Sequence, residues 1–158
     1  MDSIRIFGYK SFKKLSVQLH PINLLIGANG AGKSNFLSLF EMLGNIYEKR
    51  LGAYVAQVGG VDKLLYQGRK VTDRIAVNLL IAKSEYDLAL LESDGKLIVE
   101  REVVGCYDDV CPLDLVKKNV ITEFQSESSL KDHKEEDLSN YISQIRKFHF
   151  HDTGRRSP

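Results

Sequence analysis

The residues with the clearest chemical potential lie between positions 27 and 35 of this 158-residue chain. They fit the spacing G-x-x-x-x-G-K-[ST], in which a lysine and a serine follow the second required glycine. Glycine has no Cβ, so the backbone can pass close to phosphate oxygens and turn successive N–H groups towards them. We therefore predict a phosphate-binding loop formed by Gly27, Ala28, Asn29, Gly30, Ala31, Gly32, Lys33, Ser34 and Asn35.

Two side chains of this loop have distinct expected roles. The ammonium group of Lys33 would stabilise the charge of the β- and γ-phosphates, which is the catalytic contribution we assign to it. The hydroxyl of Ser34 would ligate a Mg²⁺ ion that bridges the same phosphates. A helix that begins near Gly32 would add free amides and the positive end of its dipole. The pattern predicts binding of ATP with Mg²⁺.

Two other groups of residues have types that can bind a metal ion. His149, His151 and Asp152 place two imidazoles on one strand face with a carboxylate beside them, and exposed or interface histidines are the alternative. Cys106 and Cys111 are close in sequence, but a zinc site would normally need a second ligand pair. Two reduced, structural thiols are the better interpretation of the cysteines.

The elements that must position the loop are predicted on both sides of it. Residues 3–9 and 15–19 alternate apolar and polar side chains, which is typical of an antiparallel pair of half-buried strands. Residues 22–26 form a short apolar run that predicts a strand buried on both faces and leading into the loop. After the loop, apolar side chains recur at helical spacing from Ser34 to about Glu48.

The middle of the chain predicts a β-rich region. Residues 49–72 contain several glycines and predict an irregular connection, with one turn of helix at Val61 to Tyr66. The Asp94-Gly95 dipeptide suits a tight hairpin turn with positive φ. A β-meander is predicted from three strand-like runs, which are residues 74–82, 86–91 and 96–104.

The last third predicts a helix, a strand and a tail. The charged run 126–140 is typical of the solvated face of a helix. Its buried side would consist of Leu138, Tyr141, Ile142 and Ile145. Residues 146–151 alternate again, as a strand does. Arg155 and Arg156 are more typical of a solvated tail than of a phosphate- or nucleic-acid-binding face.

Composition indicates one globular domain over residues 1–158, with 43% hydrophobic and 27% charged residues. A net charge of +1 offers no general argument for a nucleic-acid partner. No run of eighteen apolar residues and no signal-peptide pattern is present, so we expect a cytoplasmic protein with no membrane contact.

Two stretches, the second of which includes the loop, resemble the opening of the RecF/SMC-type branch of ABC ATPases. Residues 4–13 contain the phrase GYKSF, which is similar to the GFKSF of that branch. Within residues 22–35, positions 27–35 match its GxNGxGKSN pattern. Residues 71–104 are similar to its antiparallel lobe. Residues 148–153 resemble a strand and polar loop of its predicted-ATPase members.

The resemblance implies an α/β P-loop NTPase fold, the N-terminal part of an ABC-type head with an antiparallel β-subdomain. Its segments would be residues 1–48 with strands, loop and helix, residues 71–104 with the antiparallel lobe, and residues 126–158 with helix, strand and tail. It also implies that Gln125 senses the metal from a Q-loop and that Asp152 or His151 contacts Mg²⁺ or its water. For Gln125, a glutamine that simply follows a strand is the alternative.

Several catalytic elements of that branch have no counterpart in this sequence. There is no apolar strand that ends in Asp-Glu, no Ser-Gly-Gly signature and no later switch histidine. We therefore expect ATP binding without efficient hydrolysis by this chain alone, whereas the intact protein would be an ATPase.

Partners and alternatives follow from the same resemblance. It implies a homodimer of heads or a partner subunit, with DNA as a partner by analogy only. A catalytically inactive nucleotide-binding or regulatory module is the main alternative. A small-molecule kinase or a GTPase ranks last. A kinase would need lid arginines and an acceptor site, and a GTPase would need an N-K-x-D motif, which the sequence does not contain.

Overall fold

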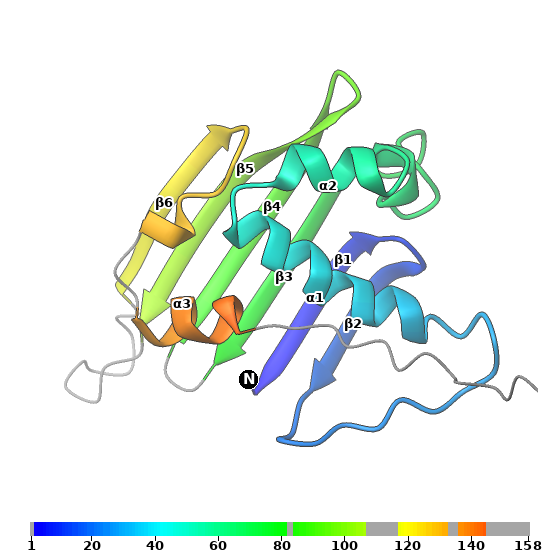
Figure 1. The fold of residues 1–158 in the computed structure, drawn as a ribbon, viewed down its shortest axis with the longest axis horizontal. Helices are drawn as coiled ribbons and strands as arrows, with labels where there is room; N and C mark the ends of the chain where they lie inside the picture. Colours follow the sequence, from blue (N-terminus) through cyan, green and yellow to red (C-terminus); the bar gives the residue numbers. More distant parts are fainter. Residues whose placement is uncertain (1, 82–83, 107–116, 133–135, 145–158) are drawn as a thin grey trace, which may run out of the picture.

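A computed structural model of the chain describes residues 2–81, 84–106, 117–132 and 136–144. These residues form a six-stranded sheet with helices on one face (Figure 1). The strand order is β2-β1-β3-β4-β5-β6, and all neighbouring pairs are antiparallel. The strands are β1 (Ser3–Tyr9), β2 (Phe12–Gln18), β3 (Arg74–Ile81), β4 (Ser84–Ser93), β5 (Lys96–Cys106) and β6 (Lys117–Gln125).

The strands form where alternating side chains allow one face to be buried. In β1, Ile4 and Ile6 point into the core, while Arg5 and Phe7 point outward. The predicted pairing of the first two strands is confirmed, with Ile6 opposite Leu15. The meander of β3, β4 and β5 is also confirmed. Its last turn has positive φ at Asp94 and Gly95, as the dipeptide predicts.

Among the described residues, three α-helices cover one face of the sheet, which we call the inner face. They are α1 (Lys33–Tyr47), α2 (Leu51–Gln57) and α3 (Glu136–Ser143). Helix α1 confirms the predicted helix after the loop. Four of its buried side chains follow the spacing i, i+3, i+4, i+7: Leu39, Met42, Leu43 and Ile46. In the described part of the chain, no helix is long and apolar enough to cross a membrane.

The prediction of a buried strand at residues 22–26 is wrong. This segment has no regular secondary structure, and Figure 1 shows the trace between β2 and α1 running outside the sheet. Ile22 is 90% exposed and Ile26 is 83% exposed. A run that is apolar on both faces needs neighbours on both faces. Among the described residues β2 is an edge strand and pairs only with β1, so no strand accepts the segment.

The connection between α1 and β3 is more regular than predicted. Helix α2 lies within residues 49–72, and the expected turn at Val61 to Tyr66 is a short 3₁₀-helix at Val61–Lys63. Leu51, Tyr54 and Val55 are buried at helical spacing, so tertiary packing stabilises seven residues despite Gly52.

The predicted helix over residues 126–140 is partly wrong. Residues 126–132 form bends and a 3₁₀-helix at Leu130–Asp132, and α3 begins only at Glu136. Leu138 and Ile142 are buried as expected, but Tyr141 is 41% exposed. Ile145 and the strand predicted at residues 146–151 lie outside the described residues.

Candidate phosphate-binding site

The glycine-rich loop adopts a backbone that other residues would resist. Gly30 has φ of 85° and Gly32, the N-cap of α1, has φ of 90°. These values lie in the left-handed region, which glycine enters without a steric penalty. Between them, Ala31 donates its N–H to the Ala28 carbonyl at 3.2 Å and closes a turn. The loop can therefore fold back on itself just before the helix.

Two of the loop glycines are also closely surrounded by other atoms. A Cβ on Gly27 would lie 3.2 Å from the Cβ of Ala31. A Cβ on Gly32 would lie 3.2 Å from both the Phe12 ring and the Ser11 hydroxyl. Both contacts are tighter than ordinary van der Waals packing. A side chain at either position would therefore force its neighbour in the loop or the β1–β2 turn to move.

The start of α1 concentrates positive charge at the loop. The first helical hydrogen bond runs from the Phe36 N–H to the Gly32 carbonyl at 2.9 Å, so the amides of residues 33–35 precede it. The Lys33 ammonium donates to the carbonyls of Gly27 at 2.6 Å and Ala28 at 2.7 Å. Free amides, a helix dipole and an ammonium group together form an environment for a multivalent anion.

The turn between β1 and β2 supports the loop, and sequence reasoning assigned it no role. Ser11 accepts a hydrogen bond from the Asn35 side chain at 2.9 Å. The Lys10 ammonium donates to the Ser38 hydroxyl on α1 at 2.8 Å. Lys10 itself has φ of 46°, as a tight turn requires. No spacing rule for phosphate loops includes these residues. Their only sequence signal is their place in the GYKSF phrase.

A buried pair of tyrosines fixes the first half of α1. The Tyr9 hydroxyl lies 2.9 Å from the Ser38 hydroxyl, and the Tyr54 hydroxyl donates to the Ser38 carbonyl at 3.3 Å. Burial raises the pKa of Tyr9 far above its usual value, and the charge of Glu41 adds to this effect. Burial likewise raises the pKa of Tyr54.

Because the pKa values of Tyr9 and Tyr54 are raised, we expect the free energy of unfolding to fall at alkaline pH. A raised folded-state pKa adds stability that is fully present below the unfolded pKa of about 10 and is lost as pH rises above it. Between its unfolded pKa and its higher folded pKa, a buried tyrosine lowers the free energy of unfolding by up to about 1.4 kcal/mol per pH unit. Urea denaturation at pH 8, 10 and 11 measures the slope. Tyr9→Phe should show a shallower slope than the unmodified chain, and equal slopes would contradict the assignment.

The structure does not bring every predicted metal ligand to the loop. Gln125 ends β6, at the opposite sheet edge from β2, whose first residue Phe12 contacts Gly32. Asp152, His149 and His151 lie outside the described residues, as does Cys111. Within the described ranges, no cluster of three or more histidine, cysteine, aspartate or glutamate side chains could hold a metal ion. Ser34 remains the expected metal ligand, exposed at the start of α1.

An apolar hollow of about 470 Å³ lies beside the loop. One wall is the edge strand β2, with Phe12, Leu15 and Val17, and the other is the exposed segment 22–26. Gly32 and Lys33 also line it. The site therefore combines a cationic loop with an apolar neighbouring surface.

Fold and site together define a mixed α/β protein with a glycine-rich loop at the N-terminus of a helix. A family model described as the AAA ATPase domain matches residues 1–152, so the chain belongs to this family. Membership supports a nucleotide-binding, ATPase-like role. A comparison with curated protein sequences finds no significant match.

Proposed function

We propose that this chain binds ATP with Mg²⁺ through Gly27 to Asn35. The observation that carries the proposal is the position of Lys33. Its ammonium lies against the carbonyls of Gly27 and Ala28, in a loop where a Cβ on Gly27 or Gly32 would crowd its neighbours. Family membership supports the choice of a nucleotide over a simpler anion.

Each loop residue has a defined part in this proposal. The amides of residues 33–35 would donate to phosphate oxygens, and Lys33 would exchange its carbonyl acceptors for phosphate. Ser34 would ligate Mg²⁺, which supplies charge neutralisation when bound. Asn35 is already held by Ser11, so the first turn of α1 is ordered by the β1–β2 hairpin. Preorganisation of this kind lowers the entropic cost of binding.

The finer proposal is that the chain is the N-terminal part of a RecF/SMC-like ATPase head. In such a protein, ATP binding and hydrolysis would be coupled to dimerisation of heads, with DNA as a partner by analogy. The exposed run at residues 22–26 supports this proposal, since its apolar side chains would be covered by further polypeptide in a larger domain. A catalytically inactive nucleotide-binding module remains the alternative, because the sequence contains no Asp-Glu strand.

Calorimetric titration of the chain with ATP and Mg²⁺ tests the proposal. We expect saturable binding of one nucleotide, weakened when EDTA removes Mg²⁺, and no steady-state release of phosphate. The proposal of nucleotide binding is overturned if the titration shows no heat of binding and ATP does not change the midpoint of thermal unfolding. If the chain alone hydrolyses ATP, the expectation that it lacks the groups for efficient hydrolysis is wrong. A strong preference for GTP would favour the GTPase alternative.

A further inference from the structure

A carboxylate on strand β5 is buried between the sheet and the elements that cover it. Glu102 is 0% exposed. A strict alternation from Val99 would point it outward, but the pairing of β4 with β5 shifts register between Ala89 and Leu90. Glu102 therefore lies opposite Leu88 and faces the helices. A β-bulge has redirected a charged side chain into the core.

The Glu102 carboxylate accepts three hydrogen bonds. The Tyr86 hydroxyl donates to Oε1 at 2.5 Å and the Ser128 hydroxyl donates to the same oxygen at 2.6 Å. The Ser129 N–H donates to Oε2 at 3.0 Å. Burial raises the pKa of Tyr86, and the charge of Glu102 raises it further, so Tyr86 stays a donor. In the described part of the chain, no cation pairs with Glu102. Burial of a carboxylate without a paired cation costs free energy, and the three hydrogen bonds offset that cost.

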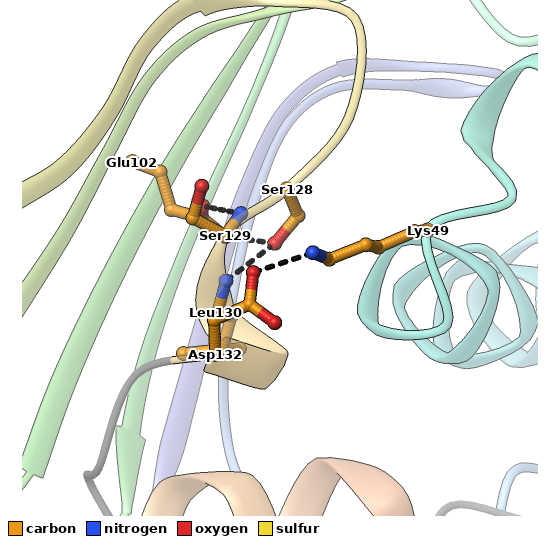
Figure 2. Close-up of polar contacts among 6 residues, drawn as sticks. All are labelled: Lys49, Glu102, Ser128, Ser129, Leu130 and Asp132. Atoms are coloured by element: carbon orange, nitrogen blue, oxygen red, sulfur yellow. Dashed lines mark hydrogen bonds and ion pairs between the residues drawn. The ribbon is translucent and has the colours of Figure 1, made fainter.

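What Glu102 holds is the segment Ser126–Asp132, which we name the clamp segment. Figure 2 shows Ser128 and Ser129 at the Glu102 carboxylate and Asp132 reaching Lys49 at the end of α1. The Ser128 hydroxyl also accepts the Leu130 N–H at 3.0 Å, so one side chain links the carboxylate to the 3₁₀-helix. The clamp segment is thus fixed to the sheet at its centre.

The outer side of the clamp segment holds the junction of α1 and α2. Lys131 pairs with Glu48 at 2.6 Å, and Asp132 pairs with Lys49. Glu127 accepts the N–H of Leu51 at 3.0 Å, which caps the first turn of α2. The contacts all fall within a few residues of the C-terminal end of α1.

Helix α1 joins this junction to the phosphate-binding loop. Its 15 residues span about 22 Å and behave as one rod. Its apolar side packs on the sheet, but apolar burial is non-directional and does not by itself fix a position along the helix axis. Polar contacts supply that direction at both ends of the helix: those of Ser38 and Asn35 near the loop, and those of the clamp segment at the far end. The amides of residues 33–35 move with the rod.

We propose that Glu102 is a positioning residue for the nucleotide site: through the clamp segment it sets the position of α1 and so of the phosphate-binding loop. The proposal rests on the proposed function. Because coupling between two sites is reciprocal, a bound nucleotide should also tighten the clamp segment.

The surface pair between Lys49 and Asp132 gives the sharpest test, because its side chains are 42% and 65% exposed and contribute little to stability. Lys49→Glu and Asp132→Lys should each weaken binding of Mg²⁺ and ATP about threefold to tenfold, measured with a fluorescent ATP analogue on folded protein. The double variant Lys49→Glu with Asp132→Lys should restore affinity to within about twofold. Arg69→Glu breaks a similarly exposed pair with Asp62 that does not touch α1, and it should leave affinity unchanged.

Two further measurements address Glu102 itself. Glu102→Gln keeps an acceptor for Tyr86 and Ser128 but presents an amide donor to the Ser129 N–H, and it should weaken nucleotide binding as well. Hydrogen exchange at Ser129 and Leu130 should slow when nucleotide is added. If the unmodified chain binds nucleotide while both surface variants bind equally well, the positioning role is overturned and the proposed function stands. If the unmodified chain binds no nucleotide, both proposals fail. Should Glu102→Gln not fold, the surface variants still decide the question.

Discussion

Replacement of Lys33 with alanine should weaken the binding of Mg²⁺ and ATP by about tenfold to a hundredfold. Hydrogen bonds to charged groups contribute about 1.5–3 kcal/mol each, and the ammonium is the only side-chain cation within the loop sequence. In the free chain Lys33 makes only exposed bonds to the carbonyls of Gly27 and Ala28. Its loss should therefore change the free energy of unfolding by no more than about 0.5 kcal/mol. The variant should therefore lose affinity for ATP while its free energy of unfolding stays nearly unchanged.

The affinity of the Lys33→Ala variant is measured by calorimetric titration at fixed ionic strength, since the contact is electrostatic. Lys63→Ala removes an exposed cation from the 3₁₀-helix after α2 and serves as the matched control, with no expected effect. If ATP changes the mobility of the chain on a sizing column, that change should disappear with Lys33→Ala. An affinity equal to that of the unmodified chain would show that the loop does not hold the phosphates.

The sequence predicts those parts of the fold that depend on local patterns. Alternation in SIRIFGY predicts a half-buried strand because a strand turns successive side chains to opposite faces. The spacing of Leu39, Leu43 and Ile46 predicts α1 for the corresponding helical reason. Asp94-Gly95 predicts its turn because both residues tolerate positive φ.

The sequence fails where a residue's environment depends on distant partners. The apolar run 22–26 shows that burial is needed on both faces, but not which segments provide it, and the described residues leave it exposed. Glu102 lies in an alternating run that predicts an outward side chain. Only the register shift between β4 and β5 turns it inward towards Ser128. Contacts of this kind follow from strand pairing, which single-strand periodicity does not encode.

The same limit applies to the candidate site. Gly27 to Ser34 are recognisable because phosphate binding constrains neighbouring residues to a fixed spacing. Ser11 and Lys10 reach α1 from a separate hairpin, so their contribution depends on the packing of β2 beside the loop. Gln125 shows the converse, because a resemblance in residue type assigned it to a metal site from which the sheet order separates it.

Gly8→Ala should destabilise the chain by about 2–5 kcal/mol, the largest effect we expect from removing no functional group. Gly8 has φ of 72°, and a Cβ there would lie 2.1 Å from the Arg74 carbonyl oxygen. That oxygen belongs to the backbone of β3, which pairs with β1, so it has no flexible side chain to move aside. The Gly8 carbonyl also accepts the Tyr66 N–H at 2.9 Å, and a backbone shift would strain this bond too.

Gly44→Ala adds the same methyl group as Gly8→Ala, but it should stabilise the chain instead of destabilising it. Gly44 lies inside α1, and no atom is within 4 Å of the Cβ that alanine would add. Alanine there should stabilise the chain by about 0.5–1 kcal/mol, because it lowers the entropy lost when the helix forms. Urea denaturation of both variants measures the two free energies of unfolding. Equal effects at the two positions would contradict the packing of Gly8 against Arg74, since the two substitutions add the same methyl group and differ only in what surrounds it.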